Sequence, residues 1–195
     1  MTFVPHTLAD CKQSLADRHD NGVVPTSSVI LARYVRLLNR GVNYCADKLK
    51  LTAKTTLTVA SGVADLPDDF SLVRAVFVDT LEYLKVDPED EAKHIGAVYW
   101  ITGNQVSGFV FNTPEDGDYV VNYAFKPSPM AVDADICIIS DIEAPVAYAY
   151  AMLRKGESDP FEDADASLEE VDARIVEMSS TLDNNEGDIG LTLDY

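Results

Sequence analysis

The sequence predicts an α+β fold in which N-terminal and C-terminal helices form a helical bundle around a central antiparallel β-rich insertion. Three observations predict this class. Apolar residues recur every three or four positions on both sides of the chain's centre, which is typical of amphipathic helices. Over about residues 55–126, β-branched and aromatic residues gather in short runs separated by turn residues. After residue 183, apolar residues alternate with small or polar ones, which predicts an extended C-terminal tail.

Four helices are predicted from this spacing. The first covers about residues 7–19 and ends before Asp20-Asn21-Gly22, which is a turn signal. The second covers about residues 27–51 and has serine and threonine side chains available to cap its start. The third, over about residues 141–154, is apolar nearly all round, and such a helix is usually buried. The fourth is predicted over about residues 167–182, because Ser167 and Glu170 have the spacing of a capping box.

The central block is predicted to be antiparallel, because its strands are joined by short connections. Leu66 to Phe70 form a predicted turn, and a strand over residues 72–78 follows it. The last three strands, over residues 98–102, 105–111 and 118–125, are separated by turn residues and predict a three-stranded meander.

The length and composition predict one globular domain over residues 1–183, followed by a tail over residues 184–195. The chain has 195 residues, of which 47% are hydrophobic and 25% charged, which is ordinary usage for a protein with a core. Its apolar runs are far shorter than the roughly 20 residues that a membrane span needs. Met1 to His6 lack the features of a secretory signal, so we expect the protein to stay in the compartment where it is made.

The net charge of −18 disfavours specific nucleic-acid binding, because such binding gains affinity from basic residues that neutralise phosphates. An acidic wall would suit a channel through which DNA slides without sticking. The charge is uneven: residues 155–195 hold 13 acidic and two basic residues, whereas residues 26–50 hold five basic and one acidic. In a ring of identical subunits, one subunit's basic face would meet its neighbour's acidic face.

No metal or cofactor site is predicted. The cysteines, Cys11, Cys45 and Cys137, are odd in number and widely spaced, and with His6 and His19 they form no recognised ligand spacing. We therefore expect structural roles for all five residues.

No catalytic site is predicted either, so the chain is not expected to be an enzyme. The acidic pairs and runs, such as Asp68-Asp69 and Asp87 to Glu91, are interpreted as solvated turns, because exposed acidic runs give no pair of carboxyl groups with separated pKa values. Glu162 to Asp165 resemble part of a calcium loop but lack its glycine and its final glutamate.

Two groups of residues are candidates for binding a partner. Arg33, Arg36 and Arg40 share a face of the second helix, which is either a solvated face or a surface for a neighbouring subunit or DNA phosphates. In the tail, alternate apolar residues would suit strand addition to another protein's sheet edge, or would fold back on the chain's own β block. These tail residues are Ile189, Leu191, Leu193 and Tyr195.

Several short motifs follow one another in a characteristic order. They are a Leu-Asn pair in the second helix (Leu38-Asn39), the Leu-Pro-x-Asp-Phe turn (Leu66 to Phe70), a strand pair (Tyr99 to Val106), a proline (Pro114) and a tyrosine-rich strand (Tyr119 to Tyr123). Their order and spacing resemble the head-tail adaptor (connector, or head completion) proteins of tailed bacteriophages, over about residues 27–178. The long acidic segment after Met178 departs from that pattern.

The resemblance implies a virion structural protein at the neck, the interface between head and tail, made in the host cytoplasm. It implies a homo-oligomeric ring, expected to have twelve subunits, that binds the portal protein, extends the DNA channel and docks a tail or nozzle protein. Packaged DNA would pass through without specific binding. No cofactor and no membrane are implied.

Two other functions remain open from the sequence. A tail-associated carbohydrate-binding module would use Tyr99, Trp100 and Tyr123 as an aromatic platform, provided that all three are exposed on one face. An acidic DNA mimic would need carboxylates spread like phosphates over its surface, and the basic face of the second helix argues against it.

Overall fold

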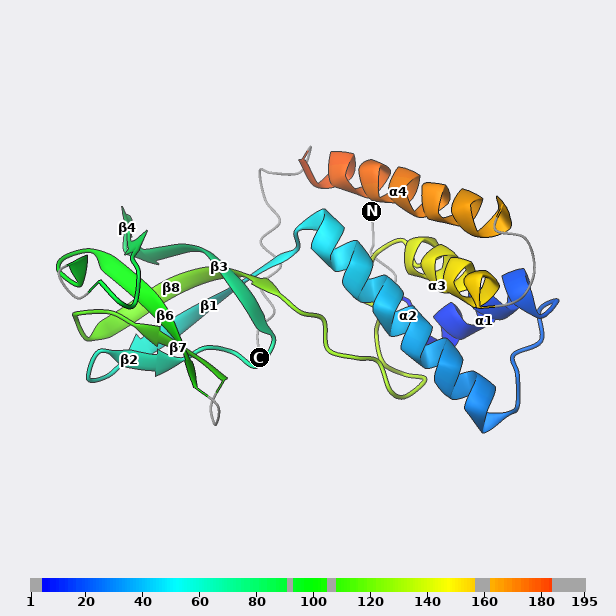
Figure 1. Ribbon diagram of the computed structural model, residues 1–195, viewed down its shortest axis with the longest axis horizontal. Coiled ribbons are helices and arrows are strands. Elements are labelled where there is room, and N and C mark those ends of the chain that lie inside the picture. The colour runs from blue at the N-terminus through cyan, green and yellow to red at the C-terminus, as the bar shows by residue number, and fades with distance from the viewer. Residues whose placement is uncertain (1–4, 91–92, 105–107, 157–161, 184–195) are drawn as a thin grey trace. The chain divides into compact units, whose positions relative to one another are not determined.

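A computed structural model of the chain describes residues 5–90, 93–104, 108–156 and 162–183 (Figure 1). They divide into two compact units. The helical unit comprises residues 5–50 and 127–183, and the β unit comprises residues 51–126. Four helices and two sheets confirm the mixed α+β class. That residues 1–183 act as one domain stays a prediction, and the predicted tail over residues 184–195 lies outside the described residues.

The four helices occupy the predicted regions of the helical unit. They are α1 (Leu8–His19), α2 (Ser28–Leu49), α3 (Glu143–Lys155) and α4 (Glu162–Asp183). The predicted start of the last helix was wrong, because α4 begins five residues before Ser167, and Ser167 is buried inside it. Acidic residues at positions 162, 163 and 165 favour this earlier start, since negative charge near a helix N-terminus is stabilised by the helix dipole.

Local capping is found at the start of α1 and at the end of α2. Thr7 and Asp10 form a capping box in which Thr7 N donates to Asp10 Oδ2 (2.7 Å) and Asp10 N donates to Thr7 Oγ1 (3.3 Å). The expected hydroxyl cap of the second helix does not form, because the Ser27 side chain makes no capping hydrogen bond. At the other end of α2, Lys50 adopts a left-handed conformation with φ of 53°.

The third helix lies at the centre of the helical unit and packs against the other three. Its buried residues are Ala144, Pro145, Val146, Ala147, Ala149, Ala151 and Leu153. This confirms the prediction of a buried helix. It packs tightly against α2 at Gly41, where an added β-carbon would lie 2.5 Å from the carbonyl oxygen of Pro145.

The β unit consists of two four-stranded sheets. One has the order β1-β8-β3-β4 and the other the order β2-β7-β6-β5. The strands are β1 (Thr52–Val59), β2 (Val63–Asp65), β3 (Phe70–Val78), β4 (Leu81–Glu82), β5 (Leu84–Lys85), β6 (Val98–Asn104), β7 (Gly108–Asn112) and β8 (Gly117–Phe125). All described pairings are antiparallel except the short parallel pair of β5 and β6.

The predicted meander was only partly correct. The strands β6 and β7 form the expected hairpin, with Ile101 opposite Phe111. The next strand, β8, leaves that sheet and lies between β1 and β3. It pairs with β1 along the whole of that strand, from Thr52 opposite Ala124 to Val59 opposite Gly117. This long ladder satisfies more backbone groups than a third meander strand beside the five-residue β7 would.

One hydrophobic core fills the space between the two sheets. Tyr119 and Val121 come from β8, Phe111 from β7 and Tyr99 from β6, and all four are buried. The rings of Phe111 and Tyr119 lie 5.4 Å apart between their centroids. The two sheets therefore pack face to face as one layered unit.

Candidate functional site

The arginine face of the helical unit is smaller than the sequence predicted. Arg36 and Arg40 are exposed on α2, as a binding face requires. Arg33 is half-buried instead, and its Nη2 lies 2.6 Å from the position that a β-carbon on Gly156 would take. Gly156 caps the C-terminus of α3, so the guanidinium of Arg33 lies where a helix dipole favours positive charge. Two of the three candidate arginines remain available to a partner.

The other candidate binding residues are Ile189, Leu191, Leu193 and Tyr195, and they lie outside the described residues. Their predicted role in strand addition stays a prediction.

Cys11 and Cys137 contact each other in the core of the helical unit, which the sequence alone did not indicate. Cys11, Cys45 and Cys137 are all buried. Burial raises the pKa of Cys45 to about 12, and a hydrogen bond to Cys137 together with burial raises the pKa of Cys11. Metal ligation requires thiolates, which burial disfavours at Cys11 and Cys45, whereas the hydrogen bond with Cys11 lowers the pKa of Cys137. In the described parts of the chain, no three histidine, cysteine or acidic side chains are grouped so as to hold a metal ion.

His19 also has a structural environment. Its Nδ1 lies 3.0 Å from Asp20 Oδ1 and 3.3 Å from the hydroxyl of Tyr34. The Tyr34 hydroxyl donates to Asp20 as well, so these three side chains connect the end of α1 to α2.

A chain of ion pairs joins the helices of this unit. Arg18 of α1 contacts Glu143 of α3 at 2.6 Å and Glu170 of α4 at 2.8 Å. Glu170 also accepts from Arg174 Nε at 2.9 Å, and Arg174 contacts Asp141 at 2.7 Å. These partly buried pairs hold the pKa of Glu170 at about 2, mainly through its hydrogen bond to Arg18. Glu170 and Arg174 are four residues apart on α4, whereas the other partners of this network are distant in sequence and were not indicated by any local pattern.

The acidic groups considered as catalytic or calcium-binding candidates have structural positions. Asp69 accepts a hydrogen bond from the Tyr123 hydroxyl at 3.1 Å. Asp87 accepts from the backbone of Glu89, and Asp90 pairs with Lys93. The segment from Glu162 to Asp165 lies in α4, so its backbone is helical and does not form a calcium loop.

The aromatic platform proposed for carbohydrate binding is not formed, so that interpretation of the three aromatic residues was wrong. Tyr99 and Tyr123 are 4% and 3% exposed and belong to the core of the β unit. Trp100 alone is half-buried, and it stacks on His94 with ring centroids 3.9 Å apart. Strand alternation places neighbouring residues on opposite faces, so Tyr99 and Trp100 do not share one.

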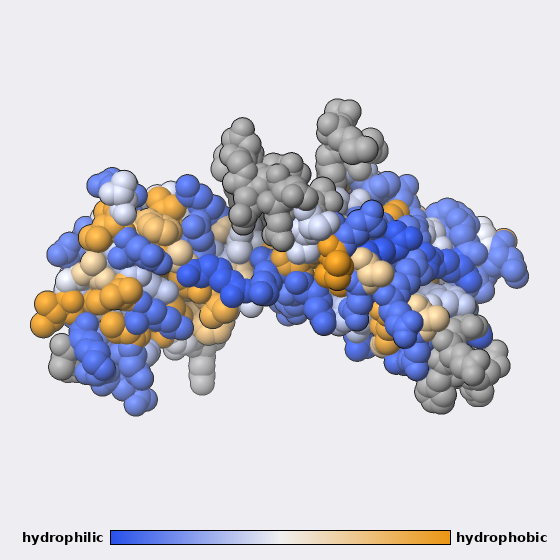
Figure 2. All heavy atoms as spheres, turned by 90° about the horizontal axis from the view of Figure 1, so that it is seen from above, coloured by the Kyte–Doolittle hydropathy of each residue, from blue (hydrophilic) through white to orange (hydrophobic). Residues whose placement is uncertain are grey.

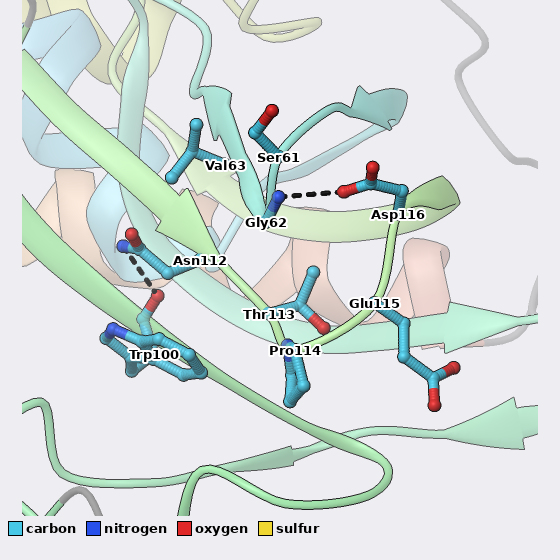
Figure 3. Close-up of a pocket in the computed structure, with 9 residues that line it drawn as sticks. All are labelled: Ser61, Gly62, Val63, Trp100, Asn112, Thr113, Pro114, Glu115 and Asp116. Atoms are coloured by element: carbon cyan, nitrogen blue, oxygen red, sulfur yellow. Dashed lines mark hydrogen bonds between the residues drawn. The ribbon is translucent and has the colours of Figure 1, made fainter.

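A shallow depression of about 680 Å³ lies on the β unit beside Trp100 (Figure 3). Its lining is Ser61, Gly62, Val63, Trp100, Asn112, Thr113, Pro114, Glu115 and Asp116. Several of its polar groups bond to the protein itself: Asp116 accepts from Gly62 N at 2.8 Å, and Asn112 Nδ2 donates to Thr102 Oγ1 at 3.0 Å. The lining holds no histidine, cysteine or lysine that would activate its one serine.

The residues of the characteristic motifs form internal contacts. Asn39 donates to the carbonyl of Met130 at 2.9 Å and accepts from its amide at 2.8 Å. Asp69 of the Leu-Pro-x-Asp-Phe turn meets Tyr123 of the tyrosine-rich strand. The motifs therefore specify the scaffold, and each pair of contacting residues is distant in sequence.

Comparison with protein families gives one match that covers most of the chain. The model of the SU10 adaptor protein family matches residues 6–186, which include both units. The chain belongs to the SU10 adaptor protein family.

Among curated proteins, the comparison found no match. The family match places this SU10 adaptor among bacteriophage adaptor proteins, which are structural components of the virion. The functional surfaces of an SU10 adaptor are therefore contact surfaces for other proteins. None of the helices that the structure describes has both the length and the apolarity needed to cross a membrane.

Apolar side chains are exposed on both units of the SU10 adaptor. On the β unit, Leu81, Leu84 and Ile95 are 56%, 67% and 78% exposed, and Figure 2 shows apolar atoms on the surface of this unit. On the helical unit, Val29 of α2 and Val176 of α4 are 77% and 69% exposed. Exposed apolar side chains can contribute to the buried core of a protein–protein interface.

Proposed function

We propose that this SU10 adaptor forms a homo-oligomeric ring, expected to have twelve subunits, at the head-tail interface of the virion. The ring binds the portal protein, extends the DNA channel and presents a docking surface for a tail or nozzle protein. The observation that carries the proposal is the family match over residues 6–186, because it covers both units.

The surface chemistry supports a role in assembly. The motif residues Asn39 and Asp69 make contacts within the chain, so partner specificity depends on other, exposed residues. Apolar side chains are exposed on both units. The net charge of −18 supports passage of DNA without specific binding, because acidic residues repel phosphates.

The C-terminal residues are part of the proposal. Ile189, Leu191, Leu193 and Tyr195 alternate with small or polar residues, and this pattern suits a strand that is added to a sheet edge of the portal or of a neighbouring subunit. Main-chain hydrogen bonds would provide affinity, and alternate side chains would provide specificity.

The proposal is tested by mixing the purified chain with the portal protein of the same phage. Native mass spectrometry and electron microscopy should show an adaptor ring on the portal with the portal's symmetry. A chain lacking residues 184–195 should bind the portal more weakly, while its helical content, measured by circular dichroism, stays close to that of the full chain. A full chain that neither binds the portal nor oligomerises with it would contradict the proposal.

A further inference from the structure

The strand β1 forms a long edge of the β unit. Of the four strands that end the two sheets, β2, β4 and β5 have two or three residues each, whereas β1 has eight. Among the described residues, β1 pairs on one side only, with β8 (Figure 1). Its other side directs backbone amide and carbonyl groups away from the sheet, where they can bind a further strand.

The sequence of β1 contains little that would block such pairing. Native sheets protect long edges with prolines, bulges or several charges. Residues Thr52 to Val59 contain no proline and one charged residue, Lys54, and the pairing with β8 runs without a bulge. We therefore expect a specific strand to cover this edge in the assembled protein.

The side chains of β1 alternate between two environments. The inward set packs toward the core of the β unit and comprises Ala53, Thr55, Leu57 and Val59. The outward set is exposed and comprises Thr52, Lys54, Thr56 and Thr58. A strand added to this edge must therefore offer apolar side chains on one face and small or polar ones on the other.

The C-terminal segment has this alternation and a matching length. Its apolar residues at positions 189, 191, 193 and 195 are separated by Gly190, Thr192 and Asp194. In an antiparallel pair, the seven residues 189–195 lie opposite the seven residues 53–59. This register sets Ile189 opposite Val59 and Leu191 opposite Leu57, so the apolar residues of the segment point toward the core.

Charge favours the antiparallel direction. In this register Asp194 lies opposite Lys54, and opposite charges on paired strands stabilise the pairing. In the parallel direction, Asp194 would lie beside Thr58, whose hydroxyl donates to Asp118 at 2.7 Å. Two carboxylates would then share one end of the sheet face, which disfavours that direction.

Resting on the proposed ring, we propose that residues 189–195 of one copy add as an antiparallel strand to β1 of the neighbouring copy. The strand and the edge that receives it are different surfaces, so the contact is heterologous and repeats around a closed ring. The five residues 184–188 join α4 to the added strand and span up to about 20 Å. The contact therefore reaches a neighbour without requiring the helical units of two copies to pack against each other.

Cross-linking tests the register. Two chains with different affinity tags, one with Thr56→Cys and the other with Thr192→Cys, are mixed and assembled on the portal protein. Dissolved oxygen with a copper catalyst takes two electrons and two protons from each pair of thiols. A disulfide should join the two chains, because opposite residues on paired strands have the Cα separation that a disulfide needs.

Thr52→Cys mixed with Thr192→Cys is the matched control. Thr52 is also exposed on β1 but lies about 14 Å along the strand from Thr56. This mixture should give about tenfold less of the cross-linked product. The native cysteines are buried and present in every variant.

A chain that carries both Thr56→Cys and Thr192→Cys distinguishes a neighbour's C-terminal segment from the chain's own. Addition to the neighbouring copy should give a ladder of covalent oligomers. Addition of the segment to β1 of the same chain would give an internally cross-linked monomer instead.

Substitutions in the C-terminal segment test which of its faces is buried. Leu191→Asp places a charge against the core of the β unit and should raise the adaptor concentration needed for half-maximal ring formation about tenfold. Thr192→Asp is the matched control, because it adds the same charge on the outward face and should change that concentration about twofold at most.

The outcomes separate this contact from the ring itself. Rings that assemble on the portal without the cross-link between Thr56→Cys and Thr192→Cys would overturn the contact and leave the proposed function standing. Internally cross-linked monomers, or equal effects of Leu191→Asp and Thr192→Asp, would also overturn it. Failure of the unaltered chain to bind the portal would contradict the proposed function instead.

Discussion

Asn39 fixes the segment before α3 to the long helix α2. Its side-chain amide makes both a donor and an acceptor bond to the backbone of Met130, at 2.9 and 2.8 Å. Asn39 and Met130 are 91 residues apart in sequence, so the Leu38-Asn39 motif by itself gave no indication of this contact. A side chain that satisfies two buried backbone groups is difficult to replace.

Asn39→Ala should therefore destabilise the protein by about 1–3 kcal/mol, because it leaves an amide and a carbonyl of Met130 without partners. Denaturant unfolding followed by circular dichroism measures this change. Asn43→Ala is a suitable control on the same helix, since Asn43 Oδ1 is buried without a hydrogen-bond partner among the described residues. Equal losses in the two variants would contradict the role assigned to Asn39.

Gly41→Ala should destabilise the protein by about 1–3 kcal/mol through overpacking. The added methyl group would lie 2.5 Å from the Pro145 carbonyl oxygen, so α2 and α3 would have to move apart. Gly103→Ala is the matched control, because no atom lies within 4 Å of its β-carbon position. The melting temperatures of the two variants provide the comparison, and a Gly41 variant as stable as the control would show that the helices do not cross at this glycine.

At the scale of the element, ion pairs connect helices that are distant in sequence. Glu170 of α4 lies between Arg18 of α1 and Arg174 of its own helix. The folded chain lowers the pKa of Glu170 from an ordinary 4.5 to about 2, so the folded state binds this proton less readily than the unfolded state does. The stabilisation is complete above about pH 4.5 and is lost as the pH falls toward 2.

Glu170→Gln should lower the unfolding free energy at neutral pH. The difference from the unaltered protein should shrink between pH 4.5 and pH 2, where the native carboxylate becomes protonated. Urea unfolding across this pH range provides the measurement. Glu169→Gln, one residue away and exposed on the same helix, should show little of this dependence. A constant difference between the Glu170 variant and the unaltered chain at every pH would contradict the assignment.

The helices could be predicted from sequence because their signals are local. The apolar spacing of α2 and α3 lies within each helix, and so does the burial that it implies. The strand order could not be predicted in the same way, because β8 takes its partners β1 and β3 from more than 40 residues earlier in the chain. The start of α4 was predicted wrongly at Ser167 because a capping box and a buried serine inside a helix have the same sequence pattern.

The candidate site was predictable only in part. Arg36 and Arg40 are exposed, as the helical spacing indicated, but Arg33 is half-buried and its guanidinium lies beside Gly156 at the end of α3. The ion pairs of Arg18 with Glu143 and of Arg174 with Asp141 gave no local signal, because these partners lie on other segments of the chain. The position of a residue on a helix face predicts whether it is exposed, whereas tertiary packing decides which exposed charges can contact a partner protein.

At the scale of the whole molecule, an SU10 adaptor is a structural protein that acts through its contacts with other virion proteins. The family match covers both the helical unit and the β unit. The motif residues Asn39 and Asp69 make internal hydrogen bonds, whereas Arg36 and Arg40 of α2 and Asp165 and Glu169 of α4 are exposed charges. These properties agree with a subunit whose stability comes from its own core and whose function comes from its surface.

Electron microscopy of the purified chain bound to its portal protein tests this account most directly. The account predicts a closed adaptor ring that follows the symmetry of the portal and surrounds a continuous central channel. Portal particles that carry no adaptor density, together with a chain that stays monomeric in their presence, would contradict it.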